Sequence, residues 1–149
     1  MNSSSQVLTG GCACGTVRYE LHSAPFDPGY CHCATCRRSS GAPVVAFATV
    51  PVNDLVVVRG QVRRRRSSDF GERWFCGDCG TQLAMRVDHQ DATIDFTIAS
   101  LDSPEGLKPR FHIFFAERIP WFEPRDTFPR HERFRPDTRG LSPLRHGGV

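Results

Sequence analysis

Short stretches of alternating hydrophobic and polar residues recur along this chain. Segments 16–22 and 93–100 alternate apolar with polar side chains, as expected for strands that bury one face. Segments 44–50 and 54–60 are compact runs rich in valine and other apolar residues, which favour strands. Glycine, proline or asparagine separates these segments and indicates turns. The pattern predicts a mainly β fold with little helix.

Length and composition define the expected domains. A chain of 149 residues is long enough for one ordinary domain and short for two. Its last part is rich in arginine and proline and poor in aliphatic residues, which is typical of an extended or loosely ordered segment. We expect a flexible amino terminus at 1–8, a folded domain at 9–123 and a tail at 124–149 that Phe128 and Phe134 pin to the domain.

Charge and hydropathy narrow the expected location and partners. The chain does not start with a basic segment and an apolar run, and no stretch approaches the ~18 apolar residues of a membrane span. We expect a cytoplasmic protein without a membrane partner. The net charge is +3, and four consecutive arginines occupy Arg63–Arg66. Such a run is usually an exposed strand or loop, although a basic surface also suits nucleic acid.

Seven cysteines form three closely spaced groups. Cytoplasmic cysteines usually stay reduced, so metal binding or catalysis explains the groups better than disulfides do. Cysteines two positions apart in an extended segment have Cα atoms about 6.6 Å apart, and leaning side chains can bring their sulfurs to the ~3.8 Å separation found on one zinc ion. The groups are Cys12 and Cys14; Cys31, Cys33 and Cys36; and Cys76 and Cys79.

Two pairs of cysteines can complete a tetrahedral zinc site. Cys76 and Cys79 are followed by Gly80, and zinc ribbons use this tight turn because glycine accepts the left-handed conformation that follows it. Together with Cys12 and Cys14 the turn would give a four-thiolate site. Such a site has no open position, so its role is structural.

The remaining cysteines are three ligands from one short segment. Cys31, Cys33 and Cys36 lie within six positions, and three protein ligands with an open fourth position are the catalytic form of zinc coordination. His32 lies between two of these ligands and is expected to point away from the metal, because neighbouring side chains in an extended segment face opposite ways.

Spacing alone leaves a second partition of the cysteines open. We prefer the first partition because its three-cysteine site needs no long-range chain closure. Iron–sulfur ligation is less favoured, since its usual cysteine spacings differ from these. The swapped partition would group Cys31 and Cys33 with Cys76 and Cys79, and Cys12 and Cys14 with Cys36.

The motifs and their order resemble those of the glutathione-dependent formaldehyde-activating enzyme family, which includes centromere protein V-like proteins. The resemblance runs from about Thr9 to Phe122 through "GGCACGTVRYE", "CHCATCRRSSGAP", "RRSSDFGERWFCGDCGTQL", "TIASLDSPEGLKPRFHI" and "IPWF". It implies a Mss4-like fold of several small twisted antiparallel sheets around two zinc ions. It also implies a structural ion on Cys12, Cys14, Cys76 and Cys79 and a catalytic ion on Cys31, Cys33 and Cys36.

The resemblance implies a carbon–sulfur lyase that joins glutathione and formaldehyde to S-hydroxymethylglutathione and cleaves it again. A zinc-bound thiolate would be the nucleophile. Another small thiol or a related aldehyde fits the cysteines equally well. Arg37 or Arg38 would anchor a substrate carboxylate unless both have only a surface role. His112 is a candidate proton carrier at the open zinc position, although a lone histidine beside apolar residues is more often a hydrogen-bonded core residue. Trp121 and Phe122 are expected in the core or the cavity wall.

Two other functions compete with catalysis of this kind. A non-catalytic zinc module could bind nucleic acid or protein through Arg63–Arg66 and the basic tail. A thiol redox protein could use Cys76 and Cys79, but zinc on those thiols would silence them. We therefore place a small thiol and a small aldehyde first among the partners, and nucleic acid only as the alternative.

Overall fold

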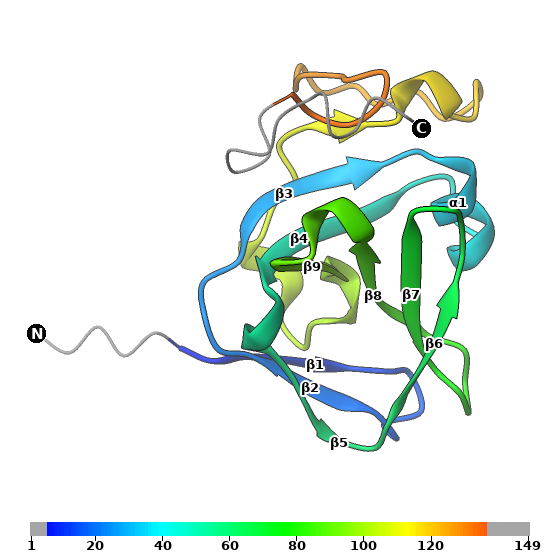
Figure 1. Ribbon diagram of the computed structural model, residues 1–149. Helices are drawn as coiled ribbons and strands as arrows, with labels where there is room; N and C mark the ends of the chain where they lie inside the picture. The colour runs from blue at the N-terminus through cyan, green and yellow to red at the C-terminus, as the bar shows by residue number, and fades with distance from the viewer. Residues whose placement is uncertain (1–5, 137–149) are drawn as a thin grey trace, which may run out of the picture.

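The fold is described from a computed structural model, which describes residues 6–136. Within these residues ten short strands and one helix, α1 (Ala34–Ser40), are joined by turns and single-turn 3₁₀ helices (Figure 1). The strands are β1 Leu8–Gly11, β2 Arg18–Leu21, β3 Phe26–Cys31, β4 Val45–Pro51, β5 Leu55–Arg59, β6 Val62–Arg66, β7 Gly71–Cys76, β8 Gln82–Val87, β9 Thr93–Thr97 and β10 His112–Ile113.

The strands form a small and a large sheet. The small sheet has the order β1-β2-β5, and the large one has the order β10-β3-β4-β9-β8-β7-β6. All pairings are antiparallel except that of β10 with β3. The predicted mainly β fold with little helix is confirmed, with seven strands gathered into one sheet.

The two faces of the large sheet pack against different parts of the chain. Residues paired directly across antiparallel strands point to the same face. One such row runs through Trp74, Ala84, Phe96 and Ala48 and packs with Tyr19 of the small sheet in the main core. The neighbouring row points the other way, toward α1 and the segment after β10, and it consists of Arg73, Met85, Asp95 and Thr49.

The strand predictions hold except at two ends. Segments 16–22 and 54–60 contain β2 and β5, and β4 extends one residue beyond segment 44–50, to Pro51. The strand predicted over 93–100 ends at Thr97, because Ile98–Ser100 forms a 3₁₀ turn. The Ser100 hydroxyl donates to the Thr97 carbonyl at 2.8 Å, and such local bonds compete with the ladder bonds of a strand.

β6 forms one edge of the large sheet. Its four arginines, Arg63–Arg66, are all exposed, which confirms the expectation of an exposed strand or loop. Two of them have partners on neighbouring elements: Arg64 lies over the Trp74 ring at 4.1 Å, and Arg66 pairs with Asp88 at 2.7 Å. At least two arginines of the basic run therefore contact neighbouring parts of the fold.

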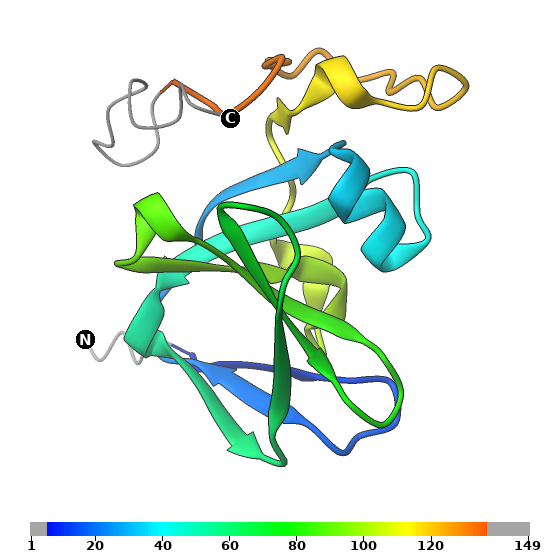
Figure 2. The ribbon, with the colours of Figure 1, turned by 45° about the vertical axis from the view of Figure 1, so that its right-hand side comes forward.

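The segment after β10 runs along the outside of β3 (Figures 1 and 2). The backbone N–H of Phe114 donates to the Arg133 carbonyl at 3.0 Å, and the Phe134 ring packs on Phe114 with centroids 4.9 Å apart. The predicted pinning by Phe134 is confirmed, whereas Phe128 is 39% exposed. The division at 123/124 stays a prediction, and residues 137–149 of the predicted tail lie outside the described residues.

The prediction that Trp121 lies in the core or a cavity wall is wrong. Its side chain is 75% exposed because it lies in a turn after the last 3₁₀ helix, Phe115–Glu117. Phe122 is partly buried, and its ring centroid lies 6.5 Å from that of His32. Among the described residues, no helix is long and apolar enough to span a membrane.

Candidate metal centres and active site

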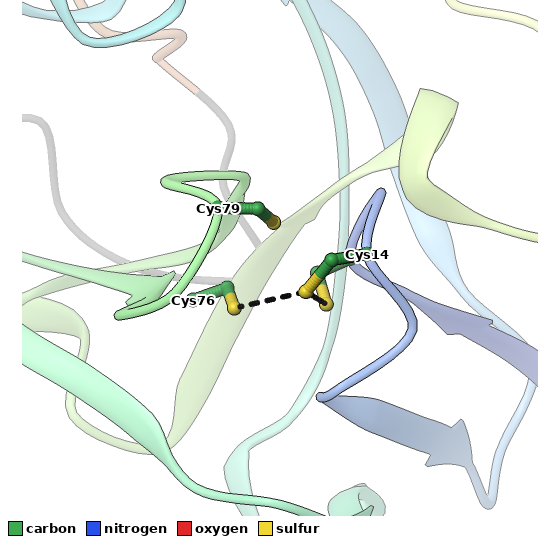
Figure 3. A group of neighbouring side chains, drawn as sticks. Cys14, Cys76 and Cys79 are labelled. Atoms are coloured by element: carbon green, nitrogen blue, oxygen red, sulfur yellow. Dashed lines mark hydrogen bonds between the residues drawn. The ribbon is translucent and has the colours of Figure 1, made fainter.

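The first cysteine group joins the two sheets. Cys12 and Cys14 lie in the loop after β1, Cys76 ends β7, and Cys79 lies in the turn that leads to β8 (Figure 3). The sulfurs of Cys12 and Cys14 are 3.6 Å apart, and those of Cys14 and Cys76 are 3.8 Å apart. All four sulfurs lie within 4.8 Å of one another.

Local backbone geometry brings these sulfurs together. Gly80 has a φ of 79°, in the left-handed region that its lack of a side chain permits. Its N–H donates to the Cys76 carbonyl at 2.8 Å, so the tight turn predicted here is confirmed. The backbone N–H of Val17 donates to the Cys12 sulfur at 3.2 Å. A hydrogen bond with the Thr81 hydroxyl lowers the pKa of the Cys79 thiol to about 5, which favours the thiolate that a metal requires.

The second cysteine group lies at the junction of β3 and α1. Cys31 ends β3, Cys33 is the N-cap of α1, and Cys36 lies in the first turns of the helix. The Cys36 backbone N–H donates to the Cys33 sulfur at 3.2 Å, and the three sulfurs lie within 4.8 Å of one another. Hydrogen bonds from Cys31 and Cys36 lower the pKa of the Cys33 thiol to about 2.

Both groups suit a thiophilic metal ion. Two thiolates on one tetrahedral zinc are about 3.8 Å apart, and the sulfur separations of 3.6 Å and 3.8 Å in the first group match this value. All-sulfur donor sets favour zinc over hard cations such as magnesium. Either group could therefore hold a metal ion. The structure groups the cysteines as in the first partition, not the swapped one.

The three-cysteine group forms part of the wall of a cavity of about 370 Å³, a size typical of small-molecule sites. In the four-cysteine group, Cys12 and Cys79 border a depression of about 750 Å³, and Cys76 borders another of about 170 Å³. Aromatic and aliphatic residues supply much of the remaining wall, and three arginines also line it. The apolar lining includes Phe47, Phe70, Met85, Val87, Ile113, Phe114 and Phe134, and the arginines are Arg73, Arg86 and Arg133.

Arg73 places a buried positive charge beside the three cysteines. Its side chain is only 9% exposed, its Nη2 donates to the Cys36 sulfur at 3.4 Å, and its Nε donates to the Ser67 hydroxyl at 3.2 Å. Among the described residues it has no carboxylate partner within 4.0 Å. The sequence analysis missed Arg73, although a charged residue at an inward position of the strand that leads into Cys76 was a usable clue.

Asp95 is the other polar side chain that the sequence analysis missed. It lies on β9, accepts a hydrogen bond from the Thr49 hydroxyl at 2.6 Å and lines both the main cavity and a neighbouring one of about 60 Å³. Burial raises the pKa of its carboxyl group to about 6. In the alternation of "TIDFT" it falls on the polar face, which resembles an ordinary solvent-facing position.

The other predicted site residues lie outside the lining of this cavity. Arg37 is partly buried and Arg38 is exposed on α1, and neither is among the residues that line the cavity. His32 and His112 are fully buried, and their ring nitrogens are 2.8 Å apart. His112 also contacts the carboxylate of Asp126 at 3.1 Å. His32 thus faces His112, while the roles predicted for the arginines and His112 stay predictions.

Comparison with known proteins agrees with this geometry. Residues 7–117 match the family described as glutathione-dependent formaldehyde-activating enzyme. A Halomonas elongata protein named "Putative glutathione-dependent formaldehyde-activating enzyme" is 27% identical over 126 residues, 78% of this chain and 80% of that protein. A Schizosaccharomyces pombe protein named an uncharacterized lyase is 34% identical over 74 residues, 50% of this chain and 53% of its own.

A solved structure has a similar fold. The crystal structure of a Rhodobacter sphaeroides protein is 31% identical, with a TM-score of 0.51. The match covers 68% of this chain and 92% of that chain. Because the family match spans residues 7–117, most of the chain, this protein belongs to the glutathione-dependent formaldehyde-activating enzyme family.

Proposed function

We propose that this chain catalyses the reversible addition of a small thiol, glutathione in the first place, to formaldehyde or a related small aldehyde. Membership of the family supports an enzyme of this class. The observation that carries the proposal is that Cys31, Cys33 and Cys36 line a cavity of about 370 Å³. A thiol-rich metal group at a ligand-sized cavity suits chemistry on a substrate sulfur.

The donor sets suggest different roles for two zinc ions. Four thiolates complete a tetrahedron and leave no position for substrate, whereas three thiolates leave one. When bound by Cys31, Cys33 and Cys36, zinc would supply the positive charge that keeps a substrate thiol deprotonated at neutral pH. We therefore assign a structural role to Cys12, Cys14, Cys76 and Cys79 and the reaction site to the other three.

Other residues of the chain would offset the excess negative charge of the three-thiolate site and exclude water from the cavity. Three thiolates carry one more negative charge than zinc neutralises, and the buried guanidinium of Arg73 beside Cys36 offsets part of this excess. The aromatic walls of Phe47 and Phe114 would keep the reacting groups together and partly dry, which turns a bimolecular attack into a local one. In the addition, a carbon–sulfur bond forms, the carbonyl π pair moves to oxygen, and that oxygen takes up a proton.

Two sets of arginines compete to bind the carboxylates of glutathione. Arg86 and Arg133 line the cavity, and guanidinium groups bind carboxylates in two-point fashion. Arg37 and Arg38 follow the three cysteines directly in sequence but lie outside the lining. We favour the first set. Removal of the anchoring arginine should raise the KM for glutathione about tenfold and leave the KM for uncharged 2-mercaptoethanol unchanged. We expect this effect in Arg133→Ala and not in Arg38→Ala.

The reaction is tested by exchange NMR with carbon-13 formaldehyde and glutathione. We expect the zinc-loaded protein to accelerate their interconversion and Cys36→Ala to return it to the uncatalysed rate. Ser39→Ala is the matched control, because Ser39 is exposed on the same helix and does not line the cavity. The same assay is run with 2-mercaptoethanol in place of glutathione. If the native protein accelerates the reaction of neither thiol, the proposed reaction is wrong for this chain.

A further inference from the structure

The proposed reaction needs a proton at the aldehyde oxygen, and no group has yet been assigned to supply it. His112, the candidate from sequence, is 1% exposed and is not part of the cavity lining. The carboxyl groups that line the cavity belong to Glu72, Asp95 and Glu117. The proton carrier should be one of these three, because a general acid or base must reach the reacting atom directly or through one water.

The two glutamates are already engaged or peripheral. Glu72 accepts a hydrogen bond from the indole N–H of Trp74 at 2.7 Å, which draws its carboxylate toward the core-facing row of the sheet. Glu117 is exposed and receives a 3.4 Å contact from the backbone N–H of Ala34. The carboxylate of Glu72 is therefore engaged by the indole, and that of Glu117 lies at the exposed rim.

Asp95 is partly buried and lines the same cavity as the three cysteines. Met85, paired directly with Asp95 on the neighbouring strand, packs in one cluster with Cys31, Cys36 and Phe47. Asp95 therefore projects from the same face as this cluster. Its Oδ1 accepts from Thr49 at 2.6 Å, so the carboxyl group is held in place while a second oxygen remains to contact substrate.

We propose that Asp95 is the group that exchanges a proton with the aldehyde-derived oxygen. This inference rests on the proposed function. In cleavage of the hydroxymethyl adduct, the Asp95 carboxylate takes the hydroxyl proton, the oxygen electron pair forms the carbonyl bond, and the carbon–sulfur pair leaves with sulfur. In synthesis the same steps run backward, with the carboxylic acid donating its proton to oxygen. Bonds and charges balance without an oxidant or reductant.

The electrostatic surroundings suit proton exchange near neutral pH. Burial, opposed by the Thr49 hydrogen bond and reinforced by the charge of Asp27, raises the pKa of Asp95 to about 6. Asp27 itself is paired with Arg135 at 2.9 Å. A general base works best when its pKa lies close to the working pH. The other charged side chains around the shared cavities are Arg73, Arg86, Arg133, Glu72 and Glu117.

The pH dependence of cleavage tests the assignment. Cleavage needs the carboxylate, so kcat of the native protein should fall as pH decreases through about 6. Asp95→Asn keeps the size and the Thr49 contact but cannot exchange the proton. We expect it to lower kcat about 100-fold, to remove the acidic limb and to leave metal content and the KM for thiol unchanged.

A second variant and a spectroscopic readout separate this role from a structural one. The Thr49 hydrogen bond lowers the pKa of Asp95, so Thr49→Val should shift the acidic limb to higher pH. Carbon-13 NMR of aspartate carboxyls should show one resonance with a raised pKa that is absent from Asp95→Asn and moves upward in Thr49→Val. This readout does not depend on turnover.

The outcomes are distinguishable. A native protein that is inactive with both thiols overturns the proposed function and this inference with it. If the native protein is active and Asp95→Asn keeps both its rate and its acidic limb, the inference alone is overturned. Loss of the limb in Glu72→Gln or Glu117→Gln, but not in Asp95→Asn, would assign the proton to the other cavity carboxylates and likewise contradict it.

Discussion

Cys33 combines two tasks in one side chain. It is the N-cap of α1, with an extended backbone at φ −63° and ψ 152°, and its sulfur accepts a hydrogen bond from the Cys36 backbone N–H. The same sulfur belongs to the three-cysteine group. Because the cap draws Cys36 toward Cys33, the start of the helix and the grouping of the sulfurs depend on one another.

Two substitutions of Cys33 separate these tasks. Serine keeps an acceptor for the cap but is a poor ligand for a thiophilic metal, whereas alanine provides neither. We expect both variants to lose one metal ion per chain and the catalytic activity, and Cys33→Ala to be less stable than Cys33→Ser by about 1 kcal/mol. Metal analysis and urea unfolding measure these effects. Equal stability of the two variants would contradict the capping role of Cys33.

At the scale of elements, β6 illustrates how charge protects a sheet edge. Unpaired edge strands invite pairing with another chain, and charged side chains discourage it. Arg63–Arg66 place four charges on this edge. Since Arg64 stacks on Trp74 and Arg66 pairs with Asp88, the run is explained by the fold and needs no nucleic acid to account for it.

Removal of charge from β6 should make the protein associate. Arg63 and Arg65 are the two arginines of the run without the partners described above, and valine at both positions would leave a β-prone, apolar edge. We expect Arg63→Val/Arg65→Val to shift sedimentation velocity profiles toward larger species than the native protein shows. The lysine double variant keeps the charge and should sediment like the native protein. Unchanged sedimentation of the valine variant would rule out this protective role.

The sequence pattern located β2, β5, β9 and all but the last residue of β4. It did not single out β1, β3, β7, β8 or β10, and β3 and β7 illustrate why. β3 contains Pro28 and Gly29, which usually indicate a turn, and its pairing with β4 includes a register shift. β7 carries Arg73 at a buried position, so its apolar alternation is interrupted. β3 and β7 both lie where the chain builds the cavity and its cysteines, and local rules often fail at functional sites.

The three-cysteine group was preferred from sequence because its members need no long-range chain closure, although spacing alone left the swapped partition open. Cys31, Cys33 and Cys36 need only a strand end and one helical turn. The approach of Asp95 to the same cavity depends instead on the order β4-β9-β8-β7 and on the register of those strands. Hydrophobic periodicity specifies which face a residue takes, but not which strands lie beside it.

At the scale of the whole molecule, the two cysteine groups constrain the chain to different degrees. Cys14 and Cys76 are 62 positions apart and connect the loop after β1 of the small sheet with the end of β7 of the large sheet (Figure 3). A cross-link that closes a loop of this length removes entropy from the unfolded chain and so raises its free energy by about 4 kcal/mol at 25 °C. The corresponding value for a five-residue loop is about 2 kcal/mol. Metal in the first group should therefore stabilise the fold more.

Loss of a ligand should thus have opposite consequences in the two groups. We expect Cys79→Ser to lower the free energy of unfolding by about 2 kcal/mol more than Cys36→Ser does, because the former releases the connection between the sheets. Conversely, Cys36→Ser should abolish turnover, and Cys79→Ser should retain it at temperatures where the variant is folded. Urea unfolding, metal analysis and the exchange assay on the same preparations measure all three quantities. If Cys36→Ser proves the less stable variant, or if Cys79→Ser loses turnover while folded, the division into a structural and a reactive group is wrong.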